Sequence, residues 1–152
     1  MKRLTALLLA LIAVSAFLLP ALAAVEEEHP AYSEADAVLL ARLITKEARG
    51  EPYEGQLAVG NVVLNRVAAN KRYFGRGLRG VIYRRNQFAK PAKKYTASAY
   101  EAAVAALCGE RVVPEYVLFF RRSDKPWRYG ARWGRIGNHT FFGNPPEEDG
   151  YD

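Results

Sequence analysis

The chain has 152 residues, of which 50% are hydrophobic and 12% aromatic, and its formal net charge at pH 7 is +6. This composition excludes a disordered or low-complexity chain, and the length suits one domain that follows a leader segment. The single cysteine, Cys108, excludes an intramolecular disulfide, and the two histidines, His29 and His139, exclude a multi-histidine zinc site, so we expect no metal and no cofactor.

The first two dozen residues are laid out like a secretory signal peptide. A positive start, Met1 to Arg3, precedes a nearly all-apolar run from Leu4 to Leu19 and a small-x-small site at Ala21 to Ala23. The apolar run is shorter than the roughly 20 residues that a membrane span needs, which favours a cleaved signal over an uncleaved anchor. The predicted organisation is a signal peptide at 1–24, a linker at 25–35, a folded domain at 36–143 and a tail at 144–152.

The first helix is predicted to begin after Ser33 and to run to about Arg49. Ser33 and Asp36 have the spacing of a capping box, in which each side chain accepts a hydrogen bond from the other residue's backbone N–H. Gly50 follows the predicted end, and glycine suits the left-handed conformation that often closes a helix.

Glu47 occupies an unexpected position on this helix. It continues the apolar stripe of Leu40, Leu43 and Ile44, although a neighbouring, more polar face was available. Partial desolvation and the negative end of the helix dipole both favour the protonated form of a carboxyl group. A glutamic acid that keeps its proton near neutral pH can protonate a glycosidic oxygen. The pattern alone favours an ordinary helix-end glutamate paired with Arg49, Arg66 or another arginine.

Two further carboxylates, Glu51 and Glu54, follow at short range. A glycosidase that uses two carboxylates needs them about 5 Å apart for retention or about 6.5–9.5 Å apart for inversion. The helix break at Gly50 leaves this separation unspecified. The simplest role for Glu51 is to accept backbone N–H groups at the start of the next helix, and Glu54 lies in its first turn, where the helix dipole favours acids.

Two more helices are expected after this break. The second runs from Glu54 to about Val67, and Gly60 in its middle, which costs roughly 1 kcal/mol of helix propensity, indicates close packing against another helix. The third begins after Thr96 as N-cap and is alanine-rich to Leu107. The intervening segments are predicted as loops at 70–80 and 86–95, separated by a short apolar run at 81–83 that fits a helical turn or a strand.

The C-terminal part of the chain is predicted to contain strands. Tyr116–Phe120 and Ile136–Phe142 are the strand candidates, with a glycine turn before the second, and the charged, aromatic segment Ser123–Trp133 between them is predicted as a loop. The predicted fold class is therefore α+β, dominated by helices, with a small C-terminal β-hairpin.

Much of the positive charge falls in two clusters with interleaved aromatic residues, at 71–85 and 121–135. For an exported protein, the anionic partners to consider are cell-wall polymers, peptidoglycan carboxylates and phospholipid surfaces. A solvated basic face without a specific ligand is an equally open interpretation. A nuclease is disfavoured, because neither paired histidines nor metal-ligand spacing is present, so we expect no nucleic acid partner.

One long, ungapped block is more specific than these patterns. The sequence EARGEPYEGQ at 47–56, followed by VVLNRV at 62–67, resembles the signature of the spore cortex-lytic, SleB/CwlJ-like cell wall hydrolases. The resemblance extends over about 37–142, with shorter matches at 80–83, 87–88 and 136–141. It implies a lysozyme- or lytic-transglycosylase-like fold, and cleavage of peptidoglycan between N-acetylmuramic acid and N-acetylglucosamine.

The resemblance also implies which residues carry the chemistry. The first glutamate of the motif, the catalytic acid/base of the family, falls on Glu47. The implied reaction is transglycosylation with this single residue, in which the muramyl C6 hydroxyl closes onto C1, whereas hydrolysis would need Glu51 or another acid to position a water. The residues expected to bind the substrate are Glu51, Tyr53, Gln87, Phe88, Trp127, Asn138 and His139.

Two departures from the family pattern affect these expectations. Phe119 to Ser123 replaces the aromatic-Asn-Pro turn expected after the first strand, and we expect no separate N-terminal wall-binding domain. The basic, aromatic loops with Arg121, Arg122 and Trp127 are therefore candidates for wall affinity. We expect a secreted monomer that meets the membrane only through its signal peptide, with peptidoglycan as its partner and an accessory protein left open. The alternative is a catalytically silent wall-binding module of the same fold.

Overall fold

The computed structural model describes residues 32–146, so the predicted signal peptide at 1–24 and most of the predicted linker lie outside the described residues. Within this range the fold class is the predicted one, α+β with helices dominant. None of the helices between residues 32 and 146 is long and apolar enough to cross a membrane. The elements are α2 (Glu34–Ala48), α3 (Tyr53–Ala69), α4 (Gly77–Ile82), α5 (Ala97–Leu107), β1 (Val117–Arg121), β2 (Ala131–Ile136) and β3 (His139–Gly143).

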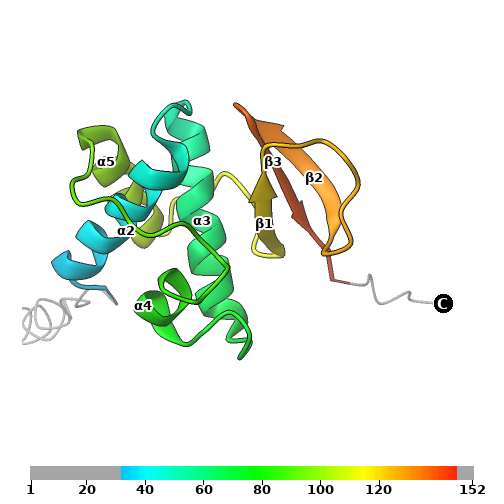
Figure 1. Cartoon of the computed structure of the whole chain (residues 1–152), viewed down its shortest axis with the longest axis horizontal. Helices are drawn as coiled ribbons and strands as arrows, with labels where there is room; N and C mark the ends of the chain where they lie inside the picture. The colour runs from blue at the N-terminus through cyan, green and yellow to red at the C-terminus, as the bar shows by residue number, and fades with distance from the viewer. Residues whose placement is uncertain (1–31, 147–152) are drawn as a thin grey trace, which may run out of the picture. The chain divides into compact units, whose positions relative to one another are not determined.

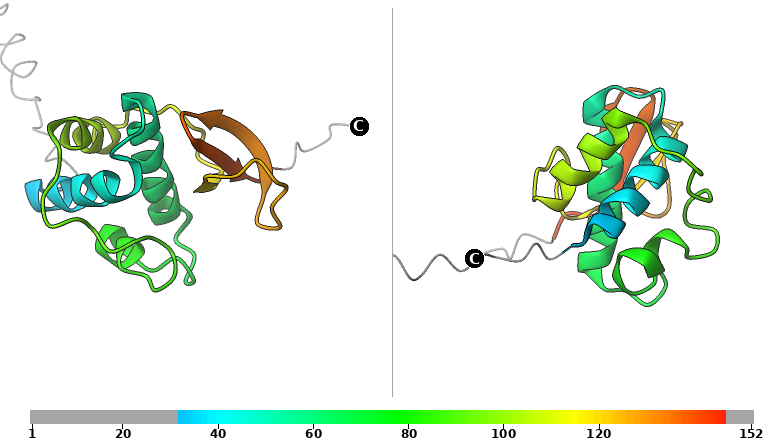
Figure 2. Two further views of the ribbon diagram at one scale, coloured as in Figure 1. Left: turned by 45° about the horizontal axis from the view of Figure 1, so that its top comes forward. Right: turned by 90° about the vertical axis from the view of Figure 1, so that its left-hand side faces the viewer.

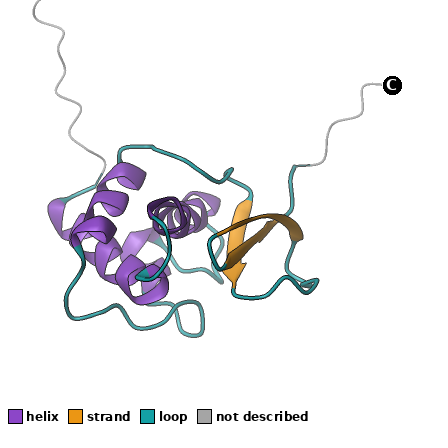
Figure 3. Cartoon of the chain, turned by 90° about the horizontal axis from the view of Figure 1, so that it is seen from above, coloured by secondary structure: helices purple, strands orange, loops and turns teal. Residues whose placement is uncertain are grey.

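The helix α3 is the centre of the fold (Figure 1). It contacts α2, α4 and α5, and it also contacts β1 and β2. The other helices gather on one side of α3 and the small sheet lies on the other, as the further views agree (Figures 2 and 3). All residues from Gly55 to Arg66 are buried, which explains why this helix is apolar or small around most of its circumference.

The capping signals read from the sequence are confirmed at two helix starts. The Ser33 hydroxyl accepts a hydrogen bond from the Asp36 N–H at 3.3 Å, and the Asp36 carboxylate accepts one from the Ser33 N–H at 3.0 Å. The Thr96 side chain caps α5 by accepting from the Ala99 N–H. The expectation for Gly50 is wrong, because α2 ends with Arg49 in a right-handed conformation and Gly50 does not have a positive φ.

The close helix packing predicted at Gly60 is confirmed. A Cβ atom at this position would lie 3.2 Å from the Ala106 Cβ and 3.3 Å from the Ile44 Cδ1, which belong to α5 and α2. These distances are shorter than ordinary van der Waals contact, so the missing side chain lets three helices meet. The meeting point lies in the main core, where Leu40, Ile44 and their neighbours are fully buried.

The predicted hairpin is part of a three-stranded antiparallel sheet in the order β1-β3-β2. The strand β2 overlaps the end of the segment predicted as a loop, and β3 begins at His139, whereas a strand was predicted from Ile136. The strand was missed because it is an edge strand whose side chains are mostly exposed, so its apolar alternation is weak. Gly137, with a φ of +58°, occupies the first position of the two-residue turn between β2 and β3, the place that type II′ turns give to glycine.

The apolar run at 81–83, which fitted a helical turn or a strand, belongs mainly to the short helix α4. Its residues Leu78, Val81 and Ile82 are buried in the main core. Their burial holds the long connection between α3 and α5 against the helices, and the Ala92 N–H of this connection donates to the Arg42 carbonyl of α2.

Candidate active site

Glu47 lies in the last turn of α2 and lines a cleft of about 650 Å³. The walls of this cleft come from α2 and α3, from the connection between Tyr73 and Phe88, and from β1 with the loop that follows it. Five of the lining side chains other than Glu47 are phenylalanine or tryptophan, so the walls are largely aromatic. A cleft of this size with a few polar groups is typical of a small-molecule or oligosaccharide site.

The carboxylate of Glu47 is half-buried and has one oxygen free for a ligand. Its Oε1 accepts a hydrogen bond from the Ala89 N–H at 2.7 Å, which holds the side chain in place. Its Oε2 has no hydrogen-bond partner within residues 32–146 and is not among the fully buried atoms there. No ion pair joins Glu47 to a lysine or arginine of the described residues, so the helix-end ion pair that the pattern also allowed is not formed.

The structure brings four of the predicted site residues together in this cleft. Gln87, Phe88 and Trp127 line it with Glu47, although they come from segments up to 80 residues away in the sequence. The Gln87 Oε1 accepts a hydrogen bond from the Arg66 Nη1 at 3.2 Å, and the Phe88 ring stacks on Phe120 at 6.2 Å between centroids.

Glu51, expected to contact the substrate, does not line the cleft. Its side chain is 0% exposed, and its carboxylate accepts hydrogen bonds from the Asn138 N–H at 2.7 Å and the Asn138 Nδ2 at 3.3 Å. The Arg122 guanidinium, itself 67% exposed, lies 3.6 Å away. The carboxylate therefore joins the α2–α3 corner to the β2–β3 turn, and the expected bonds to N–H groups at the start of α3 are not formed.

Tyr53, Asn138 and His139 also lie outside the lining of this cleft. Tyr53 is exposed at the start of α3, and Asn138 is held by Glu51. His139 is only 3% exposed, with the Phe120 ring 4.9 Å and the Phe141 ring 6.4 Å from its own. Burial lowers the pKa of His139 below its ordinary value, although the nearby negative charge of Glu51 acts to raise it. The Nδ1 of His139 has no hydrogen-bond partner among the described residues.

The free energy of unfolding should fall as the pH drops below about 6.5, the ordinary pKa of histidine. Because the pKa of His139 is lower in the folded state, the unfolded chain binds this proton more readily between the two values. The stability that comes from neutral His139 is thus complete above the pKa that His139 has in the unfolded chain. It is lost as the pH falls through the lower pKa that His139 has in the folded protein. Urea unfolding of wild type and His139→Gln between about pH 5 and 8 measures the effect. Equal pH slopes for the two proteins would contradict it.

Arg66 is the site residue that the sequence did not reveal as such. It is 4% exposed on α3, and its guanidinium carbon lies 4.9, 4.4 and 5.2 Å from the ring centroids of Phe74, Phe88 and Phe119. Its Nε donates to the Leu118 carbonyl at 2.7 Å, which ties α3 to β1. Burial lowers the pKa of Arg66 to about 10, so the group is still charged at neutral pH. The available signal was an arginine that follows the apolar run at 62–64 within a helix.

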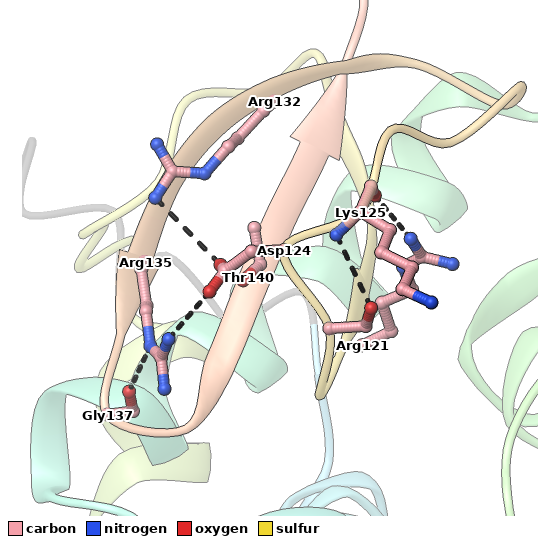
Figure 4. Close-up of polar contacts among 8 residues, drawn as sticks. Arg121, Asp124, Lys125, Arg132, Arg135, Gly137 and Thr140 are labelled. Carbon is pink, nitrogen blue, oxygen red and sulfur yellow. Dashed lines mark hydrogen bonds and ion pairs between the residues drawn. The ribbon is translucent and has the colours of Figure 1, made fainter.

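The loop after β1 is held against the sheet by Asp124 (Figure 4). Its carboxylate accepts from the Thr140 hydroxyl at 2.5 Å and the Arg135 Nη1 at 2.7 Å, and the Arg132 guanidinium lies 4.0 Å away. These partners, Thr140 foremost, hold the pKa of Asp124 below its ordinary value. The anchored loop presents Trp127 to the cleft, which fixes one aromatic wall.

Within the part of the chain that the structure describes, no three histidine, cysteine, aspartate or glutamate side chains gather as metal ligands would.

The comparisons with known proteins define the family. Residues 50–142 match the family model described as Cell Wall Hydrolase, and the chain belongs to this family. The matched range begins three residues after Glu47. The chain is 36% identical over 118 residues to the spore cortex-lytic enzyme of Bacillus subtilis (strain 168), a match that covers 72% of this chain and 38% of that protein. It is 35% identical over 122 residues to the cell wall hydrolase CwlJ of the same organism, covering 72% of this chain and 86% of that protein.

Two solved structures share the fold. The catalytic domain of Bacillus cereus SleB superposes with a TM-score of 0.63 at 29% identity, covering 73% of this chain and 91% of that chain. The catalytic domain of the germination-specific lytic transglycosylase SleB from Bacillus anthracis gives 0.64 at 29% identity, covering 74% and 97%. The fold predicted from the resemblance is thus confirmed. The chain spans little more than a third of the length of the Bacillus subtilis spore cortex-lytic enzyme.

Proposed function

We propose that this protein cleaves the glycosidic bond between N-acetylmuramic acid and N-acetylglucosamine in peptidoglycan, with Glu47 as its acid/base. The observation that carries the proposal is the half-buried Glu47 carboxylate, anchored by Ala89 and with one oxygen open to an aromatic cleft. Aromatic side chains are suited to stack on pyranose rings. The family and the names of the relatives, which include a lytic transglycosylase, support the same reaction.

The mechanism needs one protein carboxyl group. Glu47 gives its proton to the bridging oxygen as the bond from the muramyl C1 to that oxygen breaks, leaving an oxocarbenium-like centre at C1. The muramyl C6 hydroxyl then bonds to C1 and returns its proton to Glu47. Among residues 32–146, Glu47 is the only acid that lines the cleft, and Glu51 is buried in a structural contact. This arrangement favours transglycosylation over hydrolysis with a second carboxylate.

The site of action follows from the leader and the substrate. A signal peptide at 1–24 would export the chain as a monomer to the cell wall or spore cortex, where peptidoglycan is found. A fusion of residues 1–31 to a reporter without its own signal should be exported, whereas retention in the cytoplasm would reject this part of the proposal.

Release of soluble fragments from purified peptidoglycan tests the reaction itself. The wild-type protein should solubilise the wall and should leave chitin, which lacks muramyl residues, intact. Sedimentation with the wall without any release, on both cortex and vegetative wall, would instead show a catalytically silent binding module.

The structure shows that Arg121, Arg122 and Trp127 also have structural contacts, so their replacement is a poor test of wall affinity. Arg121 lies over the rings of Trp127 and Phe142, at 5.1 and 5.5 Å, and its Nη2 donates to the Lys125 carbonyl within the loop. Replacing Arg121 and Trp127 would therefore disturb the loop and the cleft wall. Arg122 also pairs with buried Glu51, so removing all three would not report on wall binding alone.

The exposed charges of Lys125 and Arg128 on this loop are the better test. We expect Lys125→Gln with Arg128→Gln to weaken sedimentation with anionic wall severalfold at low salt, and the difference to disappear at high salt because exposed charges are screened. Neither side chain pairs with Asp124, and Arg128 contacts the ring and hydroxyl of its neighbour Tyr129 alone among the described residues, so the Asp124 contacts that hold the loop remain. Arg42→Gln with Arg79→Gln, on two helices, is the matched control for charge. Equal binding by both double variants and wild type would reject a role for the loop.

A further inference from the structure

Arg66 carries a buried charge that forms no ion pair with a carboxylate of the described residues, and the charge of Glu47, in the same cleft, offsets only part of its desolvation. Charged side chains are almost never this buried unless they are paired, because transfer of the charge out of water is strongly unfavourable. Within residues 32–146 no aspartate or glutamate forms an ion pair with Arg66. The faces of Phe74, Phe88 and Phe119 offset only part of this cost.

The hydrogen bonds of Arg66 leave one edge of its guanidinium unused. A guanidinium has five N–H donors. The Nε donates to Leu118 and the Nη1 to Gln87, whereas the Nη2 has no partner among the described residues. The Nη2 is not among the fully buried atoms that lack a partner. Because Arg66 is 96% buried overall and lines the Glu47 cleft, the accessible edge opens into that cleft.

We propose that this edge of Arg66 binds the lactyl carboxyl group of the muramyl residue and thereby makes the cleft select muramyl glycans over chitin-type glycans. The assignment rests on the proposed function. N-acetylmuramic acid differs from N-acetylglucosamine by the lactyl ether on O3, so this arm is the one feature a selective site can recognise. Its carboxyl group is anionic when free and becomes an amide when it carries a peptide, and either form presents oxygen acceptors.

The surroundings of Arg66 make such a contact discriminating. A charge-assisted hydrogen bond is about twice as strong as a neutral one, and a site with few water molecules strengthens it further. A glycan without the lactyl arm would leave the Nη2 donors covered and unpaired, and sites built around a hydrogen bond reject analogues that lack its partner. The Gln87 and Leu118 bonds hold the guanidinium so that this edge keeps facing the cleft.

The affinity of the Glu47→Gln protein for glycans, measured by calorimetry, tests the assignment, because this variant should bind a glycan without cleaving it. Three tetrasaccharides are compared: alternating N-acetylglucosamine and N-acetylmuramic acid with free lactyl carboxylates, the same glycan as its lactyl amide, and chitotetraose. We expect the carboxylate form to bind about 10- to 100-fold more tightly than chitotetraose, with the amide between them. Adding Arg66→Lys should remove most of this difference, and the matched Arg79→Lys, at an exposed position of α4, should leave it unchanged.

A second measurement does not depend on how well the Arg66 variant folds. The Arg66 Nε–H is hydrogen-bonded to Leu118 and should give an observable NMR signal in ¹⁵N-labelled Glu47→Gln. This signal should move when the muramyl glycan is added and remain in place with chitotetraose. Equal affinities for the three glycans with an unmoved Arg66 signal would overturn the assignment. Wall release by the wild type would then still support the proposed function, whereas absence of release would reject that function itself.

Discussion

Replacing Glu47 by glutamine should lower the rate of glycan release from purified peptidoglycan by about 10²- to 10⁴-fold, the usual contribution of a general acid/base. Glutamine has the same shape, and its Oε1 can still accept the Ala89 N–H bond that anchors the side chain. It cannot donate a proton to the bridging oxygen in the way that a carboxylic acid does. Initial rates of soluble-fragment release, at matched protein concentration, measure the loss.

The matched control for this substitution is Glu54→Gln. Glu54 is an exposed glutamate in the first turn of α3 and does not line the cleft, so its removal should leave the rate close to that of wild type. Both variants should melt near the wild-type temperature. A Glu47→Gln protein that keeps the wild-type rate would remove Glu47 from the mechanism.

Replacing Glu51 by alanine should lower the free energy of unfolding by about 3 kcal/mol. The substitution removes the buried carboxylate that accepts from the Asn138 N–H and Nδ2, and with it the charge-assisted hydrogen bonds that join the α2–α3 corner to the β2–β3 turn. The loss of the ion pair with Arg122 adds little, because that guanidinium is exposed and stays solvated. Urea unfolding followed by circular dichroism gives the difference.

Two controls separate a structural role of Glu51 from a catalytic one. Glu54→Ala removes a neighbouring but exposed carboxylate and should change stability little. Gly137→Ala places a Cβ against the Glu51 Oε2 and forces alanine into a left-handed conformation, so it should weaken the same junction from the other side. If Glu51→Ala kept full stability and lost activity, Glu51 would be a second catalytic carboxylate and hydrolysis would become the better mechanism.

The features that could be predicted from the sequence depend on residues close together in the chain. The caps at Ser33 and Thr96 each involve residues three apart in the sequence. Gly60 is noticeable because glycine is unfavourable in the middle of a helix. The EARGEPYEGQ block indicated Glu47, which the structure places in an aromatic cleft. These signals are local, so they are visible without knowledge of the tertiary contacts.

The features that could not be predicted depend on contacts between distant residues. Glu51 bonds to Asn138, 87 positions later, so its burial could not be read from its neighbours. Arg66 becomes a cleft residue only because β1 and the connection after α3 surround it with three aromatic rings. The strand β2 is the exception, because the Gly137–Asn138 pair is a recognisable two-residue turn signal that predicts a strand directly before it.

The sugar ends released from purified peptidoglycan by wild type and by Glu47→Gln, identified by mass spectrometry, test the central claim most directly. Transglycosylation by Glu47 predicts anhydromuramyl ends from the wild-type protein and none from the variant. Reducing muramyl ends from the wild type would contradict the one-carboxylate mechanism, because they require water as the nucleophile and a second group to activate it.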